Sequence, residues 1–128
     1  MATMQAMVTS ATNPVTATIT RGRGPAPVDL VHLARQTFGS AELEREVLRL
    51  FVDQGADLVG RIARADRIER AALVHRLKGS ARSIGAGRVA RLTEALEAPE
   101  LAEAEARRLI GALEEAVGEV ESFVHSIF

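Results

Sequence analysis

The sequence predicts an all-α fold, an antiparallel four-helix bundle with an additional short N-terminal helix. From residue 28 onward the apolar residues recur at steps of three and four, as they do on one face of a helix. No stretch alternates apolar and polar residues with the period of two that is typical of strands. Four long amphipathic segments are joined by short connections, which makes neighbouring helices antiparallel. With 128 residues, 47% of them hydrophobic, the chain can fill the core of one domain.

The domain is expected to comprise residues 28–128, preceded by a disordered leader over residues 1–27. The leader mixes Ala, Thr, Met, Gly and Pro without periodicity and ends in the run RGRGPAP. Such a composition is typical of segments that do not pack into a core. The leader has neither a basic n-region nor an apolar h-region, so a secretory signal is not expected.

Turn and capping residues define the first two helices. A short helix is expected over Asp29–Phe38, ended by Gly39, because glycine commonly closes helices in the left-handed conformation. Ser40 is expected to cap the second helix with its hydroxyl oxygen. The inward stripe of this second helix is predicted to be Leu43, Val47, Leu50, Phe51, Leu58 and Ile62.

The remaining three helices are assigned in the same way. Asp66 is expected to cap a third helix over residues 67–84, and a fourth continues after residues 85–87 to about Glu97. Pro99 is expected in the first turn of a last long helix, where proline is tolerated. The predicted inward residues are Ile68, Ala71, Val74, Leu77, Ala81 and Ile84 on the third helix, Val89, Leu92 and Leu96 on the fourth, and Leu109, Leu113, Val117, Val120, Val124 and Ile127 on the last.

Composition excludes several classes of function. Without cysteine, the chain can form no disulfide, thiolate metal site or cysteine nucleophile. The formal net charge of -1 argues against nucleic-acid binding, and no stretch approaches the roughly 20 apolar residues of a membrane span. His32 and His125 lack acidic partners at ligand spacing, so no metal site is expected. A cytoplasmic protein is the resulting prediction.

Charge is distributed unevenly along the chain. Residues 61–91 contain nine basic and two acidic residues, whereas residues 94–121 contain nine glutamates and two arginines. One interpretation is that helix faces of opposite sign attract each other across the bundle. The other is a basic surface suited to phosphate or to an acidic partner. The charge pattern by itself leaves both open.

The third helix carries the residues that indicate chemistry. His75, Lys78, Gly79 and Arg82 lie at helical spacing on the side away from the inward stripe, so His75 is expected to be exposed. Glycine inside a helix costs about 1 kcal/mol relative to alanine, and at Gly79 it would let another molecule's backbone approach the imidazole. Lys78 is the only lysine among 16 basic residues. A flexible ammonium can follow a phosphoryl group more freely than the planar guanidinium of arginine can.

The run HRLKGSA at residues 75–81, followed by Gly85-Ala86, resembles the signature of the histidine-containing phosphotransfer (HPt) domain family. The resemblance extends over about Val28–Ile127 and implies a four-helix bundle with a short extra helix. This chain departs from many relatives at Val74, where they carry Ala, and has Arg76 at a position that varies widely in the family.

The resemblance implies a role for each residue of the site. His75 would be the phosphorylated residue, Lys78 would stabilise the phosphoryl group, and Gly79 would give clearance to a docking domain. Glu97 corresponds to a position on the following helix where relatives often carry Gln or Glu, although a solvated residue at the helix end explains it equally well. A carboxylate there would accept the Nδ1 proton and leave Nε2 free to attack. Ser80 is a further candidate neighbour of the imidazole, although packing or a hydrogen bond back to its own helix explains it better.

The implied function is a phosphorelay between His75 and the aspartates of response-regulator receiver domains, in a bacterial two-component system. The chain has no Gly-rich phosphate loop followed by Lys-Ser/Thr, so it is expected to be a phosphocarrier rather than an enzyme that uses ATP. The expected partners are receiver domains and an upstream hybrid or sensor histidine kinase. No cofactor is expected on this chain, which would act as a monomer; Mg²⁺ would belong to the receiver. Docking is expected to involve the exposed flank of the third helix and Leu33 or Phe38.

Two other functions remain open. One is a helical scaffold that binds receiver domains without being phosphorylated. The other is the dimerisation helix pair of a sensor kinase, in which an acidic residue typically follows the histidine. Arg76 fits that second pattern poorly.

Overall fold

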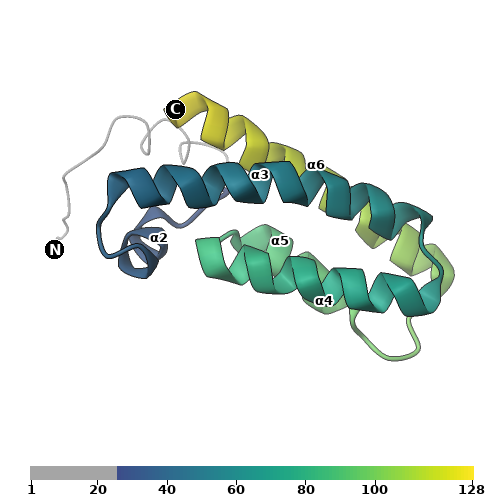
Figure 1. Cartoon of the computed structure of the whole chain (residues 1–128). Helices are drawn as coiled ribbons and strands as arrows, with labels where there is room; N and C mark the ends of the chain where they lie inside the picture. The colour runs from purple at the N-terminus through teal and green to yellow at the C-terminus, as the bar shows by residue number, and fades with distance from the viewer. Residues whose placement is uncertain (1–25) are drawn as a thin grey trace, which may run out of the picture.

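Residues 26–128 are described by the computed structural model of the chain, and they fold into helices alone. The leader expected over residues 1–27 therefore lies outside the described residues, except for its last two positions. No strand occurs between residues 26 and 128, which confirms the all-α prediction. The five helices, drawn in Figure 1, are α2 (Leu30–Gln36), α3 (Ala41–Arg64), α4 (Arg67–Ile84), α5 (Gly87–Leu96) and α6 (Glu103–Ile127).

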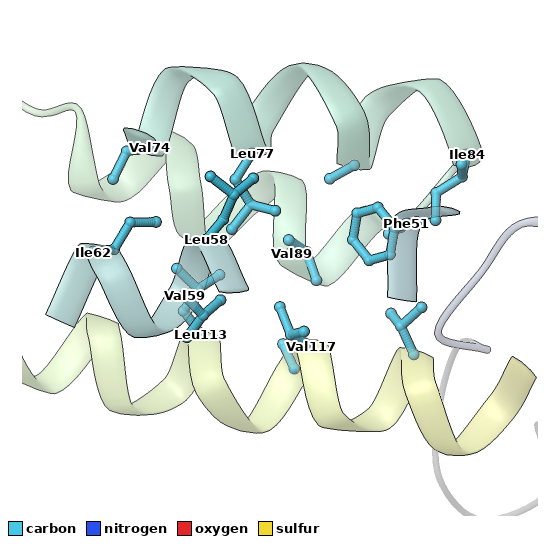
Figure 2. Packing of buried hydrophobic residues seen from close by; sticks show 14 of the residues in the cluster. Phe51, Leu58, Val59, Ile62, Val74, Leu77, Ile84, Val89, Leu113 and Val117 are labelled. Atoms are coloured by element: carbon cyan, nitrogen blue, oxygen red, sulfur yellow. The ribbon is translucent and has the colours of Figure 1, made fainter. Parts of the chain in front are cut away.

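The four longer helices enclose one hydrophobic core. Helix α3 packs against α4 and α6, and α5 packs against the same two helices. Figure 2 shows Leu58 and Ile62 of α3 directed toward α4, with Leu113 and Val117 of α6 on the other side of α3. An amphipathic helix owes most of its stability to such burial. The core therefore fixes the position of α4 and of the residues on its outward face.

Three capping residues begin their helices, and for Ser40 and Asp66 this confirms the prediction. Asp29 accepts hydrogen bonds from the backbone N–H groups of Val31 and His32, each at 3.1 Å. The Ser40 hydroxyl accepts one from the third residue of its helix at 3.1 Å, and Asp66 accepts one in the same way at 2.8 Å. These bonds satisfy amide groups that lack a partner within the helix. The starts of α2, α3 and α4 are therefore determined by local sequence.

The apolar stripe of α3 is rotated relative to the prediction. Leu43 and Leu50 are exposed, Leu50 by 54%, while Leu48 and Val59 are buried in their place. Two rows of apolar residues run along α3, and both satisfy helical spacing. Contacts with α4 and α6 decide which row is buried, so spacing within α3 could not identify it.

The stripe of α4 differs from the prediction at its first turns. Ile68 is 86% exposed and Ala71 is exposed, whereas Arg70 and Leu73 are buried. Arg70 can be buried because its Nη2 donates a hydrogen bond of 3.0 Å to Oε2 of Glu103 in α6. A buried charge needs such a partner, and the partner lies on another helix.

The connection between α5 and α6 is longer than predicted. Pro99 lies in a turn, and α6 begins only at Glu103, so the expectation of Pro99 in its first turn is wrong. Glu100 lies in this connection with a positive φ of 60°, a backbone conformation that a right-handed helix does not contain. Arg67 of α4 donates a 3.0 Å hydrogen bond to the carbonyl of Leu101 and so ties this connection to the bundle.

Helix α2 lies against the C-terminal end of α4. The Asp29 N–H donates to the Gly85 carbonyl at 2.9 Å, and the His32 ring nitrogen Nε2 lies 3.0 Å from the Arg82 carbonyl oxygen. From the sequence, Leu33 is expected to take part in docking, but it is fully buried and cannot contact a visiting domain. Phe38, the other residue expected there, is 93% exposed.

Alanine at Gly85 is expected to lower the free energy of unfolding by about 1–3 kcal/mol. Gly85 has a φ of +78°, and a Cβ there would lie 3.0 Å from the Asp29 Cβ and 3.1 Å from the Asp29 carbonyl oxygen. Urea denaturation of wild type and Gly85→Ala measures the difference. Gly118→Ala is a suitable control, because a Cβ at Gly118 meets nothing within 4 Å. Equal loss of stability in both variants would contradict the expectation.

Candidate functional site

His75 stands on the outward face of α4, near the middle of the helix. Its side chain is 76% exposed, while the neighbouring Val74 and Leu77 are buried in the core. The exposed position agrees with the helical spacing, which separates His75 from the buried stripe. The helix is continuous on both sides of His75, so the imidazole projects from a rigid support.

Glu97 brings His75 and Lys78 together. This residue caps the C-terminal end of α5, and its two carboxylate oxygens contact different residues of α4. Oε2 lies 3.3 Å from Nδ1 of His75, and Oε1 accepts a hydrogen bond of 2.6 Å from Nζ of Lys78. An ionised carboxylate can only accept, so Nδ1 must carry the proton of this contact. The neutral ring then has its lone pair on Nε2, the nitrogen that does not contact Glu97.

Glu97 is held in the ionised form. The hydrogen bond from Lys78 is the main cause that lowers the pKa of the Glu97 carboxyl below its usual value, and the contact with His75 adds to it. Desolvation acts in the opposite direction but does not outweigh these contacts. At neutral pH the carboxylate is therefore a permanent acceptor for the imidazole N–H.

The contribution of Glu97 to stability is expected to depend on pH. Because its pKa is lower in the folded chain, the ionised contact stabilises the fold above the usual glutamate pKa of about 4.3 and is lost as pH falls through the lowered folded value. The difference in unfolding free energy between wild type and Glu97→Gln should shrink as pH falls from 7 through this acid range. Urea denaturation at a series of pH values measures it. A difference that grows toward low pH would contradict the assigned direction.

Lys78 is much less exposed than its place on the outer half of α4 suggests. Only 16% of its side chain is accessible, because the ammonium group is directed onto Glu97. Spacing within α4 predicts a cation beside the imidazole but does not predict this ion pair, because Glu97 lies on another part of the chain. The ammonium keeps two further donors after the bond to Glu97.

Gly79 and Ser80 differ in their surroundings. A Cβ added at Gly79 would meet no atom within 4 Å, so packing inside the described chain does not require glycine at this exposed position. Ser80 is partly buried, and its hydroxyl makes no hydrogen bond with His75, Lys78 or Glu97 in the described structure. The structure thus brings together three of the five candidate residues, His75, Lys78 and Glu97, with Gly79 as open space beside them.

The oppositely charged segments meet across the bundle. Arg82 of α4 pairs with Glu94 of α5, one turn of each helix away from the pair formed by Lys78 and Glu97. This second pair is not among the sequence-based predictions, although the spacing indicates it. Lys78 and Arg82 lie four residues apart, and Glu94 and Glu97 lie three apart, so each set shares one helix face. On the other side of α5, Arg88 contacts Glu115 and Glu119 of α6. The attraction between helix faces therefore accounts for much of the uneven charge.

Within residues 26–128, no three His, Cys, Asp or Glu side chains are grouped so that they could hold a metal ion. None of the helices in this range is both long enough and apolar enough to cross a membrane.

A family model described as Hpt domain matches residues 46–123, which is more than half of the chain. The matched range runs from α3 into α6 and contains His75, Lys78, Gly79 and Glu97; α2 precedes it. Searches of curated proteins and of solved structures each returned no match. Hpt domains act in phosphotransfer of two-component signalling, as phosphocarriers without an ATP site of their own, and interact with receiver domains and kinases. The family match agrees with the resemblance seen in residues 75–81, and the chain belongs to the Hpt domain family.

Proposed function

We propose that this protein relays phosphoryl groups between Nε2 of His75 and the aspartates of response-regulator receiver domains. The observation that carries the proposal is an exposed imidazole whose Nδ1 lies 3.3 Å from the carboxylate of Glu97. That contact supports the tautomer in which Nε2 has the free lone pair. The upstream donor would be a hybrid or sensor histidine kinase, acting through a receiver domain.

The transfer step needs no proton to leave the histidine. The Nε2 lone pair attacks phosphorus, the P–N bond forms, and the bond from phosphorus to the aspartyl oxygen breaks, so that the carboxylate leaves with its electron pair. The ring becomes positively charged with Nδ1 still protonated. Glu97, ionised and in contact with Nδ1, stabilises that charge. Return of the phosphoryl group to another aspartate is the same step in reverse.

Lys78 is proposed to neutralise the phosphoryl oxygens. Its ammonium has three donors, and the bond to Glu97 uses one of them. The others are available to a phosphoryl group on His75, three residues away on the same helix. Most of the catalysis is then positioning and charge neutralisation. Mg²⁺ would be held by the receiver domain, as the resemblance implies.

The unit proposed to carry out this function is residues 28–128, with α3 to α6 as an antiparallel four-helix bundle and residues 1–27 as a leader. Burial of the Val28 side chain in the core supports a domain that begins near this residue. The protein is proposed to act as a monomer in the cytoplasm of a bacterium.

Transfer from a labelled receiver domain tests the proposal. Receiver domains of the host are phosphorylated on aspartate with ³²P and mixed with the wild-type chain. Label is expected to move to this protein in a form that is stable in alkali and labile in acid, as a phosphoramidate is. If a receiver binds and no label moves, the chain is a non-phosphorylated scaffold and the proposed relay is wrong.

A further inference from the structure

The outward face of α4 carries small side chains around His75. Ala72, Gly79 and Ser83 are exposed residues with small side chains, and they lie three to eight residues from His75 on the outer half of the helix. A Cβ at Gly79 would meet nothing within 4 Å. Another molecule can therefore come close to the helix backbone here. Larger exposed side chains on this face would contact that molecule first.

Ile68 is one such side chain. It is 86% exposed, and among the described residues it is the one large apolar side chain of α4 that is exposed to this degree. It precedes His75 by seven residues, which places it on the same face, about 10 Å away along the helix axis. The core does not use it, because the stripe of α4 is rotated toward Arg70 and Leu73.

Arg76 is the second such side chain, and its charge has no partner within residues 26–128. Three of the five basic residues of α4 have a carboxylate partner within this chain: Arg70 with Glu103, Lys78 with Glu97, and Arg82 with Glu94. Arg67 donates to a backbone carbonyl. Arg76 is exposed, follows His75 directly, and makes no hydrogen bond or ion pair with any residue between 26 and 128. Among the described residues of α4, Arg76 is thus the basic residue next to His75 whose charge is not already paired with a carboxylate.

We infer that Ile68 and Arg76 form the part of the docking surface that selects the receiver partner. An apolar side chain of the receiver packs on Ile68, and a receiver carboxylate pairs with the guanidinium of Arg76. Arginine suits this role because its planar fork binds a carboxylate through two parallel hydrogen bonds. The inference rests on the proposed function and adds to it the two residues of α4 that determine partner choice. Ile68 lies in the half of α4 nearest the connection to α3 and Arg76 lies at the middle of the helix, whereas α2 and Phe38 lie at its other end.

The experiment compares two phosphoryl donors for each variant. Phosphorylated receiver domains of the host depend on docking, whereas phosphoramidate is small and has no docking surface. Phosphoramidate transfers its phosphoryl group to Nε2 as its own P–N bond breaks and ammonia leaves. For Arg76→Glu and Ile68→Glu, the rate with the preferred receiver divided by the rate with phosphoramidate is expected to fall about tenfold, because a rim charge or apolar contact chiefly affects association. Raised salt should reduce the receiver rate less in Arg76→Ala than in wild type.

Arg49→Glu is the matched control, since Arg49 is an exposed arginine on α3 and should keep the wild-type ratio. The inference is overturned if Arg76→Glu or Ile68→Glu keeps the wild-type ratio with every receiver. It is equally overturned if Phe38→Glu, at the other end of α4, lowers the ratio more than both. A wild-type chain that accepts label from neither donor would instead refute the proposed function, and the two failures are therefore distinguishable.

Discussion

Replacing His75 with glutamine is expected to reduce phosphoryl transfer from a labelled receiver by at least about 1,000-fold, a loss of about 4 kcal/mol in transition-state stabilisation. The glutamine amide can still donate a hydrogen bond to Glu97, yet it has no nucleophilic ring nitrogen. The side chain is 76% exposed, so the free energy of unfolding should change by no more than about 0.5 kcal/mol. The initial rate of label transfer and a urea denaturation curve measure the two quantities.

His125→Gln is the control for this experiment. His125 is an exposed histidine on α6, and the proposed chemistry gives it no part. It should accept label at the wild-type rate, through the unchanged His75. Transfer to His75→Gln at a rate near wild type would show that the phosphoryl group resides elsewhere.

Replacing Gly79 with glutamine is expected to change stability and transfer in opposite directions. The fold should become more stable by up to about 1 kcal/mol, because glutamine favours the helix over glycine and a Cβ at this position meets nothing within 4 Å. Transfer from a receiver should slow by about 100-fold, because the new side chain keeps the donor from its position by an ångström or more. Denaturation curves and transfer rates of the same preparation give both values. A loss of activity together with a gain in stability cannot come from unfolding.

Gly111→Gln separates the two effects. Gly111 lies on α6, is exposed, and likewise has open space where its Cβ would be. This variant should gain similar stability and transfer at the wild-type rate. If Gly79→Gln also transfers at that rate, the glycine does not serve the approach of a partner.

The starts of α3 and α4 and the orientation of His75 could be predicted because they depend on residues a few positions apart. Ser40 and Asp66 cap helices through bonds to the third residue onward, and those bonds form wherever the helix packs. The exposure of His75 follows from its angular distance to Val74 and Leu77 along one helix. Each of these properties belongs to a single element of the chain.

The sequence alone therefore determined the all-α class, the capping residues and the face that carries His75. The tertiary structure decided which apolar row of α3 is buried, that Arg70 is buried, and that Glu97 contacts Lys78 as well as His75. The physical reason is range: hydrogen bonds and spacing within a helix act over a few residues, whereas Glu97 lies 19 residues from Lys78 and Glu103 lies 33 from Arg70. Such contacts exist only once the helices pack, because the core sets the distance and rotation between them.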